Sequence, residues 1–188
     1  MIKSRIQQSA NNFLKLLDRK TSTDAISQAA ELISNSVISG NKLIICGNGG
    51  SAADAQHVAG EFLCRFYKDR KPMSAIALTT DSSIITSISN DYKYEVVFSR
   101  QLMGIGKSGD VLLGISTSGN SKNVFQAFRR ARQMNISTIL LTGAKNETIA
   151  KYSDIIINVP STDTPRVQEM HLLIEHIICE MVEQRVCD

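Results

Sequence analysis

The sequence predicts an α/β protein with a doubly wound parallel sheet and additional helices at the N-terminus. Short apolar runs rich in β-branched residues recur along the chain, and longer segments with helical periodicity separate them. The apolar runs are continuous rather than alternating, which is typical of strands that helices cover on both faces. No linker, low-complexity tract or internal repeat divides the chain, so we expect a single domain over residues 1–188.

Two helices are expected first, over about residues 2–18 and 23–39. The polar residues 22–24 offer N-caps for the second helix, and Gly40 is placed to close it. The strands are expected at residues 42–46, 74–78, 110–115, 136–142 and 154–159. The helices that alternate with and follow these strands are expected at residues 51–67, 82–102, 121–134 and 165–186.

Composition excludes several classes of protein. Lys and Arg number 21 against 18 Asp and Glu, and basic residues cluster only at 129–132, so we expect no nucleic-acid partner. The apolar runs fall far short of the roughly 18 residues that span a bilayer, and no signal segment opens the chain. The 4 Cys lack C-x-x-C spacing and read as reduced thiols. We therefore expect a cytoplasmic protein without a membrane partner.

Both N-terminal helices carry apolar stripes that one small sheet domain need not cover, which indicates association with other copies of the chain. The stripes consist of Ile6, Phe13, Leu14 and Leu17 in the first helix and of Ile26, Ala30, Ile33 and Val37 in the second.

A glycine-rich segment, Gly47-Asn48-Gly49-Gly50-Ser51, follows the first expected strand. It fits the G-x-G-x-x-A pattern of dinucleotide-binding proteins, which also have an acidic residue about 20 positions later, at the tip of the second strand. Here the expected second strand ends near residues 78–80, and the nearby Asp81 lies roughly thirty residues past the glycines. Glycine allows close approach of a ligand to the backbone, and Asn48 and Ser51 add polar groups. We therefore expect a ligand-binding loop, with a purely structural tight turn as the alternative.

A second loop, Ser116-Thr117-Ser118-Gly119-Asn120-Ser121, follows strand 110–115 and begins a helix. Hydroxyl groups and the free amides of a helix N-terminus form a natural anion site. The G-K-[ST] of nucleotide P-loops is absent, so the loop favours a sugar monophosphate. A serine-rich helix cap is the alternative. In a third segment, Ser89-Asn90-Asp91, we expect an amide and a carboxylate that bind sugar hydroxyls, with an ordinary turn as the alternative.

Acid–base groups occur on two of the expected helices. His57 and Glu61 are spaced i, i+4 and project from one face. On the last helix, Gln168 and His176 differ by about 80° around the axis and stand just over two turns apart. Together they supply a general acid, a general base and ligands for a divalent metal. The alternatives are a surface His–Glu pair and a histidine that only packs between helices.

Four parts of the chain, taken together and in order, resemble the bacterial phosphoheptose isomerases, a family of the sugar isomerase (SIS) domain group. They are Cys46–Ser51 with His57 and Glu61, Gly109–Ser121, Leu141–Gly143, and Arg166–His171 with His176. The resemblance implies a flavodoxin-like α/β fold and a homotetramer. From the apolar stripes we expect the N-terminal helices, about residues 2–39, to form part of the subunit interface. The resemblance also implies an aldose–ketose isomerase that converts sedoheptulose 7-phosphate to D-glycero-D-manno-heptose 7-phosphate through an enediol. That reaction begins the synthesis of activated heptose for lipopolysaccharide or capsule.

The resemblance assigns roles to individual residues. Glu61 and His176 form the acid–base pair, and one zinc ion per subunit is bound by His57, Glu61, Gln168 and His176. Substrate contacts are implied for Asn48, Gly49, Gly50, Ser51, Glu61, Arg65, Asn90, Asp91, Ser116, Thr117, Ser118, Ser121 and Gln168.

Two alternatives of other classes remain. A relative of this family, the DnaA initiator-associating protein, keeps the fold and binds a replication initiator without catalysing a reaction. That relative lacks the carboxylate at the position of Glu61 and the imidazole at that of His176, and this chain has both. A sugar-phosphate-sensing regulator would need a DNA-binding module, for which the chain leaves no room.

Overall fold

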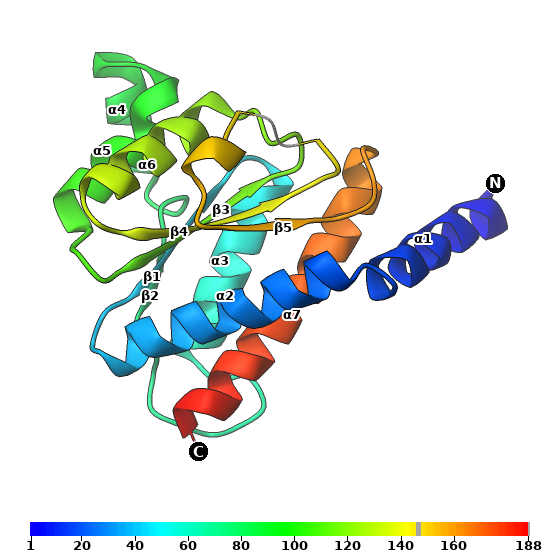
Figure 1. Ribbon diagram of the computed structural model, residues 1–188. Helices are drawn as coiled ribbons and strands as arrows, with labels where there is room; N and C mark the ends of the chain where they lie inside the picture. The colour runs from blue at the N-terminus through cyan, green and yellow to red at the C-terminus, as the bar shows by residue number, and fades with distance from the viewer. Residues whose placement is uncertain (146–147, 188) are drawn as a thin grey trace.

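A five-stranded, all-parallel sheet in the order β2-β1-β3-β4-β5 forms the centre of the computed structural model, which describes residues 1–145 and 148–187 (Figure 1). The strands are β1 (Leu43–Gly47), β2 (Ala75–Ala77), β3 (Val111–Ser116), β4 (Ser137–Thr142) and β5 (Ile155–Asn158). This order is that of flavodoxin-like folds, and it reverses between β1 and β3. The expected doubly wound sheet is confirmed, with strand ends within two residues of those predicted.

The register of β1 and β3 decides where the ligand loops lie. Leu43 pairs with Val111 at one end of the two strands, and Gly47 pairs with Ile115 at the other. The glycine-rich segment and the serine loop therefore leave the sheet side by side, at its carboxyl edge.

Seven α-helices surround the sheet within the described part of the chain. They are α1 (Ile2–Leu17), α2 (Lys20–Ile38), α3 (Gly50–Leu63), α4 (Ser82–Asp91), α5 (Val97–Ile105), α6 (Lys122–Gln133) and α7 (Thr164–Cys187). Two short 3₁₀ helices cover Tyr94–Val96 and Ala150–Tyr152. Helices α2, α3 and α7 pack on one face of the sheet, and α5 and α6 pack on the other.

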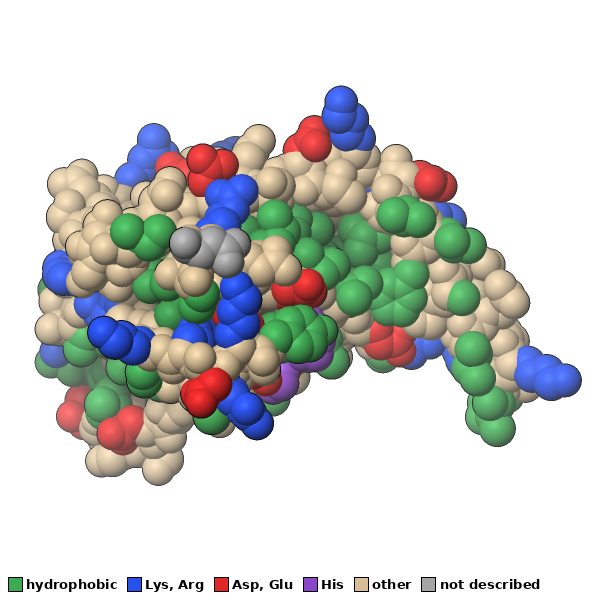
Figure 2. Space-filling model, turned by 90° about the horizontal axis from the view of Figure 1, so that it is seen from below, with side chains coloured by type: hydrophobic (Ala, Val, Ile, Leu, Met, Phe, Trp, Pro, Cys, Tyr) green, Lys and Arg blue, Asp and Glu red, His purple; other side chains and the backbone are tan. Residues whose placement is uncertain are grey.

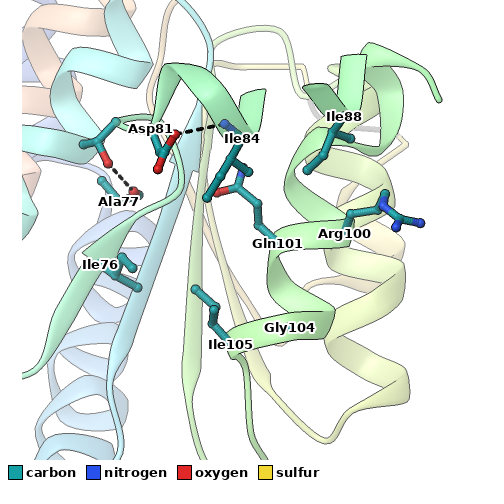
Figure 3. Close-up of a pocket in the computed structure, with 10 residues that line it drawn as sticks. Ile76, Ala77, Asp81, Ile84, Ile88, Arg100, Gln101, Gly104 and Ile105 are labelled. Atoms are coloured by element: carbon teal, nitrogen blue, oxygen red, sulfur yellow. Dashed lines mark hydrogen bonds between the residues drawn. The ribbon is translucent and has the colours of Figure 1, made fainter. Parts of the chain in front are cut away.

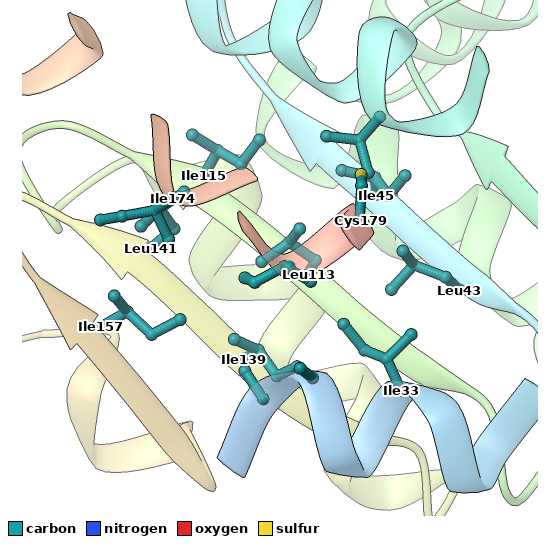
Figure 4. Close-up of a cluster of buried hydrophobic side chains, with 14 of the residues drawn as sticks. Ile33, Leu43, Ile45, Leu113, Ile115, Ile139, Leu141, Ile157, Ile174 and Cys179 are labelled. Carbon is teal, nitrogen blue, oxygen red and sulfur yellow. The ribbon is translucent and has the colours of Figure 1, made fainter. Parts of the chain in front are cut away.

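Continuous apolar strands supply both hydrophobic clusters. Alternate residues of β1 face opposite sides, so that Leu43 and Ile45 belong to one cluster and Ile44 belongs to the other. In the first cluster, Ile33 of α2 and Ile174 of α7 meet strand side chains (Figure 4). The last helix is therefore held against the sheet by burial of its apolar face.

The predicted start of the second helix was wrong, and its predicted end was right. Helix α2 begins at Lys20, so residues 22–24 lie inside its first turns and do not cap it. Ser22 instead donates a hydrogen bond to the carbonyl of Asn158 at 2.9 Å. Gly40 closes the helix as predicted, with φ +76° and its N–H bonded to the carbonyl of Val37.

The helices predicted at 51–67 and 82–102 are shorter than expected. The first, α3, ends at Leu63 because the following segment turns across α7. The second is interrupted at Tyr92, whose backbone leaves the helical region with φ −125° and ψ −100°. The Tyr92 ring lies 3.8 Å from the guanidinium carbon of Arg100 in the next helix. No Gly or Pro stands at either end, so helical periodicity alone predicted both helices to be longer than they are.

The two N-terminal stripes have different environments. Helix α1 projects from the body, and Ile6 (64% exposed) and Leu17 (70%) remain uncovered (Figures 1 and 2). Ile26 and Ile33 of α2 are buried against the chain's own sheet, so the expectation that this stripe is left over for other copies was wrong. Within the described residues, none of the helices has both the length and the apolar character needed to cross a membrane.

Candidate active site

Glycine positions at the end of β1 bring the backbone of the first loop close to the last helix. Gly49 adopts φ +57°, a conformation that favours glycine. A Cβ at Gly50 would lie 2.1 Å from Nε2 of Gln168, so the side chain of Gln168 packs directly on the first turn of α3. Ser51 is buried in that same turn, where its N–H bonds to the carbonyl of Asn48 at 3.1 Å. The predicted loop and the predicted α7 residue thus lie together.

The side chain of Asn48 is fixed by two residues that sequence reasoning missed. Its amide exchanges two hydrogen bonds with the amide of Asn123 on α6, at 2.9 and 2.8 Å. The hydroxyl of Tyr94 donates to Oδ1 of Asn48 at 2.8 Å. An asparagine amide has two N–H donors, so one remains for a ligand. Neither Asn123 nor Tyr94 belongs to a recognisable motif. They contact Asn48 because the fold brings three separate segments together.

The serine loop presents hydroxyl groups at the N-terminus of α6. The Oγ atoms of Ser116 and Ser121 lie 3.0 Å apart. Ser121 is the residue before the helix, yet its side chain forms no capping hydrogen bond. The hydroxyl of Ser118 accepts only from the backbone N–H of Asn120, at 3.3 Å, and Thr117 is half-buried. This arrangement disfavours the simple helix-cap alternative, because the hydroxyl best placed to cap α6 points elsewhere.

An open cavity of about 370 Å³ lies between the two loops. It is lined by Asn48, Tyr94, Glu95, Ser121, Lys122 and Asn123. At its rim the Lys122 ammonium pairs with the Glu95 carboxylate at 2.9 Å. The glycine-rich and serine loops therefore open onto one space at the carboxyl edge of the sheet, where ligands bind in folds of this type.

The acid–base residues of α3 and α7 meet in one chain. The Nε2 atoms of His57 and His176 lie 2.8 Å apart, and Oε1 of Glu61 lies 3.7 Å from Nε2 of His57. Two imidazole nitrogens at this distance share one proton, with one ring donating and the other accepting. The surface-pair alternative does not fully describe His57 and Glu61, because His176 from the last helix contacts His57. Figure 2 shows histidine side chains at the surface beside acidic and hydrophobic ones.

Not every predicted residue is drawn into this centre. Asn90 and Asp91 lie exposed at the end of α4, and the amide of Asn90 donates to the carboxylate of Asp91 at 2.9 Å. Arg65 is exposed on the segment after α3. Among the described residues, no hydrogen bond or ion pair joins these three side chains to the loops or to the histidines.

A second cavity, of about 480 Å³, lies elsewhere. It opens beside the edge strand β2, between α4 and α5, and is lined by isoleucines that include Ile76, Ile84 and Ile105 (Figure 3). Its polar groups already have partners, since Asp81 caps α4 and the amide of Gln101 donates to two backbone carbonyls. No acid–base pair faces it, so the candidate site remains at the carboxyl edge.

Comparison with known proteins places the chain in a family. Residues 8–143 match the family described as "SIS domain". The phosphoheptose isomerase of Aneurinibacillus thermoaerophilus is 49% identical over 185 residues, which are 98% of this chain and 93% of that protein.

The chain belongs to the phosphoheptose isomerase family.

Solved structures of the phosphoheptose isomerase family agree with the fold. Phosphoheptose isomerase GmhA from Neisseria gonorrhoeae has a TM-score of 0.92 at 39% identity, with 97% of each chain covered. A phosphoheptose isomerase from Francisella tularensis has a TM-score of 0.93 at 34% identity, over 97% of this chain and 96% of that one. The resemblance found in the sequence and the flavodoxin-like fold that it implied are confirmed.

Beside the candidate site, the helix interface of this family member buries polar groups without partners. Both carboxyl oxygens of Glu175 and both ring nitrogens of His171 are buried without a hydrogen bond, as is Oδ2 of Asp54. Burial, and secondarily the charge of Asp54, raise the pKa of Glu175 to about 8. Burial lowers the pKa of His171 to about 4, although the backbone of Thr142 offsets part of this. Both α7 groups are therefore neutral in the folded protein at pH 7.

The raised pKa of Glu175 makes a prediction about stability. The folded chain holds a proton on Glu175 that the unfolded chain, with a pKa near 4.5, releases. Protonation of Glu175 therefore contributes fully to the free energy of unfolding below the unfolded pKa of 4.5. This contribution is lost as the pH rises to the folded pKa of about 8. Relative to Glu175→Gln, the wild-type free energy of unfolding should fall across this window, by at most about 1.4 kcal/mol per pH unit.

Urea unfolding of both proteins between pH 5 and 8 measures this difference. The variant Glu31→Gln, at an exposed carboxylate of α2, serves as the control and should follow the wild type. Parallel pH profiles for Glu175→Gln and the wild type would show that Glu175 does not hold the proton.

Proposed function

We propose that this chain is an aldose–ketose isomerase that converts sedoheptulose 7-phosphate into D-glycero-D-manno-heptose 7-phosphate. The observation that carries the proposal is the contact between His57 of α3 and His176 of α7, next to Glu61. Family membership gives the class of reaction. The initiator-binding alternative is not favoured, because the matched proteins are phosphoheptose isomerases and the chain keeps both acid–base residues.

The phosphate of the substrate is assigned to the serine loop. Ser116, Thr117, Ser118 and Ser121 offer neutral hydroxyl donors, and the first turn of α6 adds backbone N–H groups. The dipole of α6 favours a dianion at this end. Lys122, the nearest cation, is already paired with Glu95 and stands 79% exposed.

The sugar is assigned to the glycine-rich loop and its surroundings. Asn48 offers its remaining amide N–H, and Gly49, Gly50 and Ser51 allow close approach to the backbone. Gln168 stands over the same turn. We assign Asn90, Asp91 and Arg65 to the sugar as well, as the resemblance to the family implies.

Isomerisation requires one carbon-bound proton and one oxygen-bound proton to move. The Glu61 carboxylate removes the proton from C1 of the ketose and returns it to C2, through an enediol. His176 moves the proton from the oxygen on C1 to the oxygen on C2, because imidazole both gives and takes protons near neutral pH. His57 contacts His176 and holds its ring in place.

The donor set fits one zinc ion per subunit. His57, Glu61, Gln168 and His176 offer nitrogen and oxygen donors, which are of the types that zinc binds, and the two imidazole nitrogens already face each other at 2.8 Å. Among the described residues, no three His, Cys, Asp or Glu side chains form a ready-made metal group, so binding would draw these side chains closer together. A bound zinc would polarise the substrate carbonyl.

We also propose that the chain acts as a cytoplasmic homotetramer and supplies heptose for lipopolysaccharide or capsule. The uncovered apolar side chains of α1 support association. The function itself is tested by incubating the pure protein with sedoheptulose 7-phosphate and following the sugar by NMR. Appearance of the aldose signals supports the proposal, and an unchanged ketose spectrum with folded protein would refute it.

The role of Glu61 predicts the effect of removing its basicity. Glu61→Gln keeps the shape of the side chain, so turnover should fall by about 10²–10⁴-fold while substrate binding is largely retained. Steady-state kinetics and calorimetric titration measure the two effects, with Glu31→Gln as the matched control. Turnover within about tenfold of wild type would exclude Glu61 as the base.

The role of the serine loop predicts a change in KM. Replacing Ser116 and Ser118 together with Ala should raise KM steeply, because each hydrogen bond lost to a charged group costs about 1.5–3 kcal/mol. Ser108→Ala, in the turn before β3 at the opposite end of the strand, is the control. An unchanged KM would mean that the loop only begins the helix.

If the apolar stripe of α1 lies in the subunit interface, a charge placed in it should weaken assembly. Ile6→Asp places a charge in that stripe and should weaken association, because a buried side chain of this size contributes about 1.5–3 kcal/mol. Gln7→Asp adds the same charge on the neighbouring face and should assemble normally. Sedimentation with activity measured across dilution compares them, and a fully active wild-type monomer would contradict the assembly proposal.

A further inference from the structure

The segment that follows α3 is tied to α7 by one buried carboxylate. Consecutive backbone N–H groups of Phe66, Tyr67 and Lys68 donate to the carboxylate of Glu183 at 3.0, 2.8 and 2.9 Å. Successive N–H groups curved around an anion form a binding concavity. The side chain of Glu183 is only 2% exposed. The Glu183 carboxylate therefore binds the protein's own backbone and fixes the path of this segment.

Arg70 extends the same contact to the end of α3. Its Nε donates to Oε1 of Glu183 at 2.9 Å. Its two terminal nitrogens donate to the backbone carbonyls of Phe62 and Glu61, at 2.9 and 2.8 Å. These carbonyls belong to the last turn of α3, which has no further helical N–H to bond them. Glu183 is thus linked through one guanidinium to the backbone of the proposed base.

The segment carries an aromatic ring to the other acid–base residue. The ring centroid of Phe66 lies 5.8 Å from that of His176, and the Tyr67 ring lies 4.5 Å from the Phe66 ring. Glu183 follows His176 by seven residues, so both project from the same face of α7. Arg65 stands immediately before Phe66. The same buried carboxylate therefore governs the surroundings of His176, of Arg65 and of the backbone at Glu61.

Burial of Glu183 is compensated by its partners. Burial acts to raise the pKa of Glu183, but the N–H groups of Lys68, Tyr67 and Phe66 and the Arg70 side chain hold it below its usual value. The carboxylate is therefore ionised at neutral pH and remains an acceptor for all four donors.

We propose that Glu183, acting through Arg70 and the segment of residues 64–71, is a positioning residue for the isomerase reaction. It orients His176 by way of Phe66 and fixes the last turn of α3 that carries Glu61. The inference rests on the proposed function, and it assigns to Glu183 no contact with substrate. A carboxylate that served stability alone would leave the arrangement at His176 unchanged when it is replaced.

The test compares Glu183→Gln with Glu180→Gln, which removes a carboxylate of the same helix that accepts a hydrogen bond from the Gln184 amide at 3.3 Å. We expect Glu183→Gln to lower kcat about 10- to 100-fold, as misplaced catalytic groups do, and to change KM far less. Nitrogen NMR signals of His176 should shift in Glu183→Gln, in the absence of substrate, and should not shift in Glu180→Gln. Normal kcat and unshifted His176 signals in folded Glu183→Gln would overturn the proposal.

Phe66→Leu keeps the proposal testable if Glu183→Gln does not fold, because it removes the ring and leaves the carboxylate contacts in place. It should reproduce the shift at His176 and the loss in kcat, and wild-type behaviour of this variant would overturn the proposal. The two claims fail separately. If the wild-type protein shows no isomerase activity, the proposed function is wrong. If Glu183→Gln nevertheless shifts the His176 signals, the effect of Glu183 on His176 still holds.

Discussion

The parallel pairing of β1 with β3 is the constraint on which the rest of the site depends. Because the strand order reverses there, the chain leaves β1 and β3 in opposite directions around the sheet, and both loops stand at its carboxyl edge. The register that pairs Gly47 with Ile115 places the loops at the same height. The double hydrogen bond between Asn48 and Asn123 then joins the first loop to the helix that follows the second. A shift of register would separate the proposed sugar and phosphate groups.

The last helix, α7, brings polar and titratable side chains to these two loops and to α3. Its apolar face is buried against the sheet, and this burial holds Gln168, His176 and Glu183, spaced about two turns apart, against α3 and the segment that follows it. The helix also buries Glu175 without a partner, which costs stability in the ionised form. One helix therefore supplies a residue over the glycine loop, the proposed proton carrier and an anchor for the neighbouring segment.

The sequence predicted those parts of the structure that local patterns encode. Continuous apolar runs placed all five strands, and the loops at the ends of β1 and β3 were expected at the sites where they occur. The pairing of His57 with His176 agreed with helical spacing on each helix, although the contact joins residues 119 positions apart. The sugar-binding role of Asn90 and Asp91 was expected from their side-chain types and from the family resemblance, and not from spacing.

The missed features all depend on contacts between distant segments. Nothing in the local sequence around Tyr94 or Asn123 indicates that both bind Asn48. The end of α3 at Leu63 follows from the attraction of three backbone N–H groups to Glu183, more than a hundred residues later. Helical periodicity continues through such positions because it reflects which side chains are buried. It does not indicate which group each backbone N–H bonds.

A crystal structure of the protein with bound sedoheptulose 7-phosphate tests the central claim most directly, because that claim concerns one continuous site. We expect the phosphate within hydrogen-bond distance of the hydroxyls of Ser116, Ser118 and Ser121, with C1 and C2 of the sugar beside the carboxylate of Glu61. A phosphate held in the cavity beside β2, or a sugar chain that extends away from α3, would contradict it.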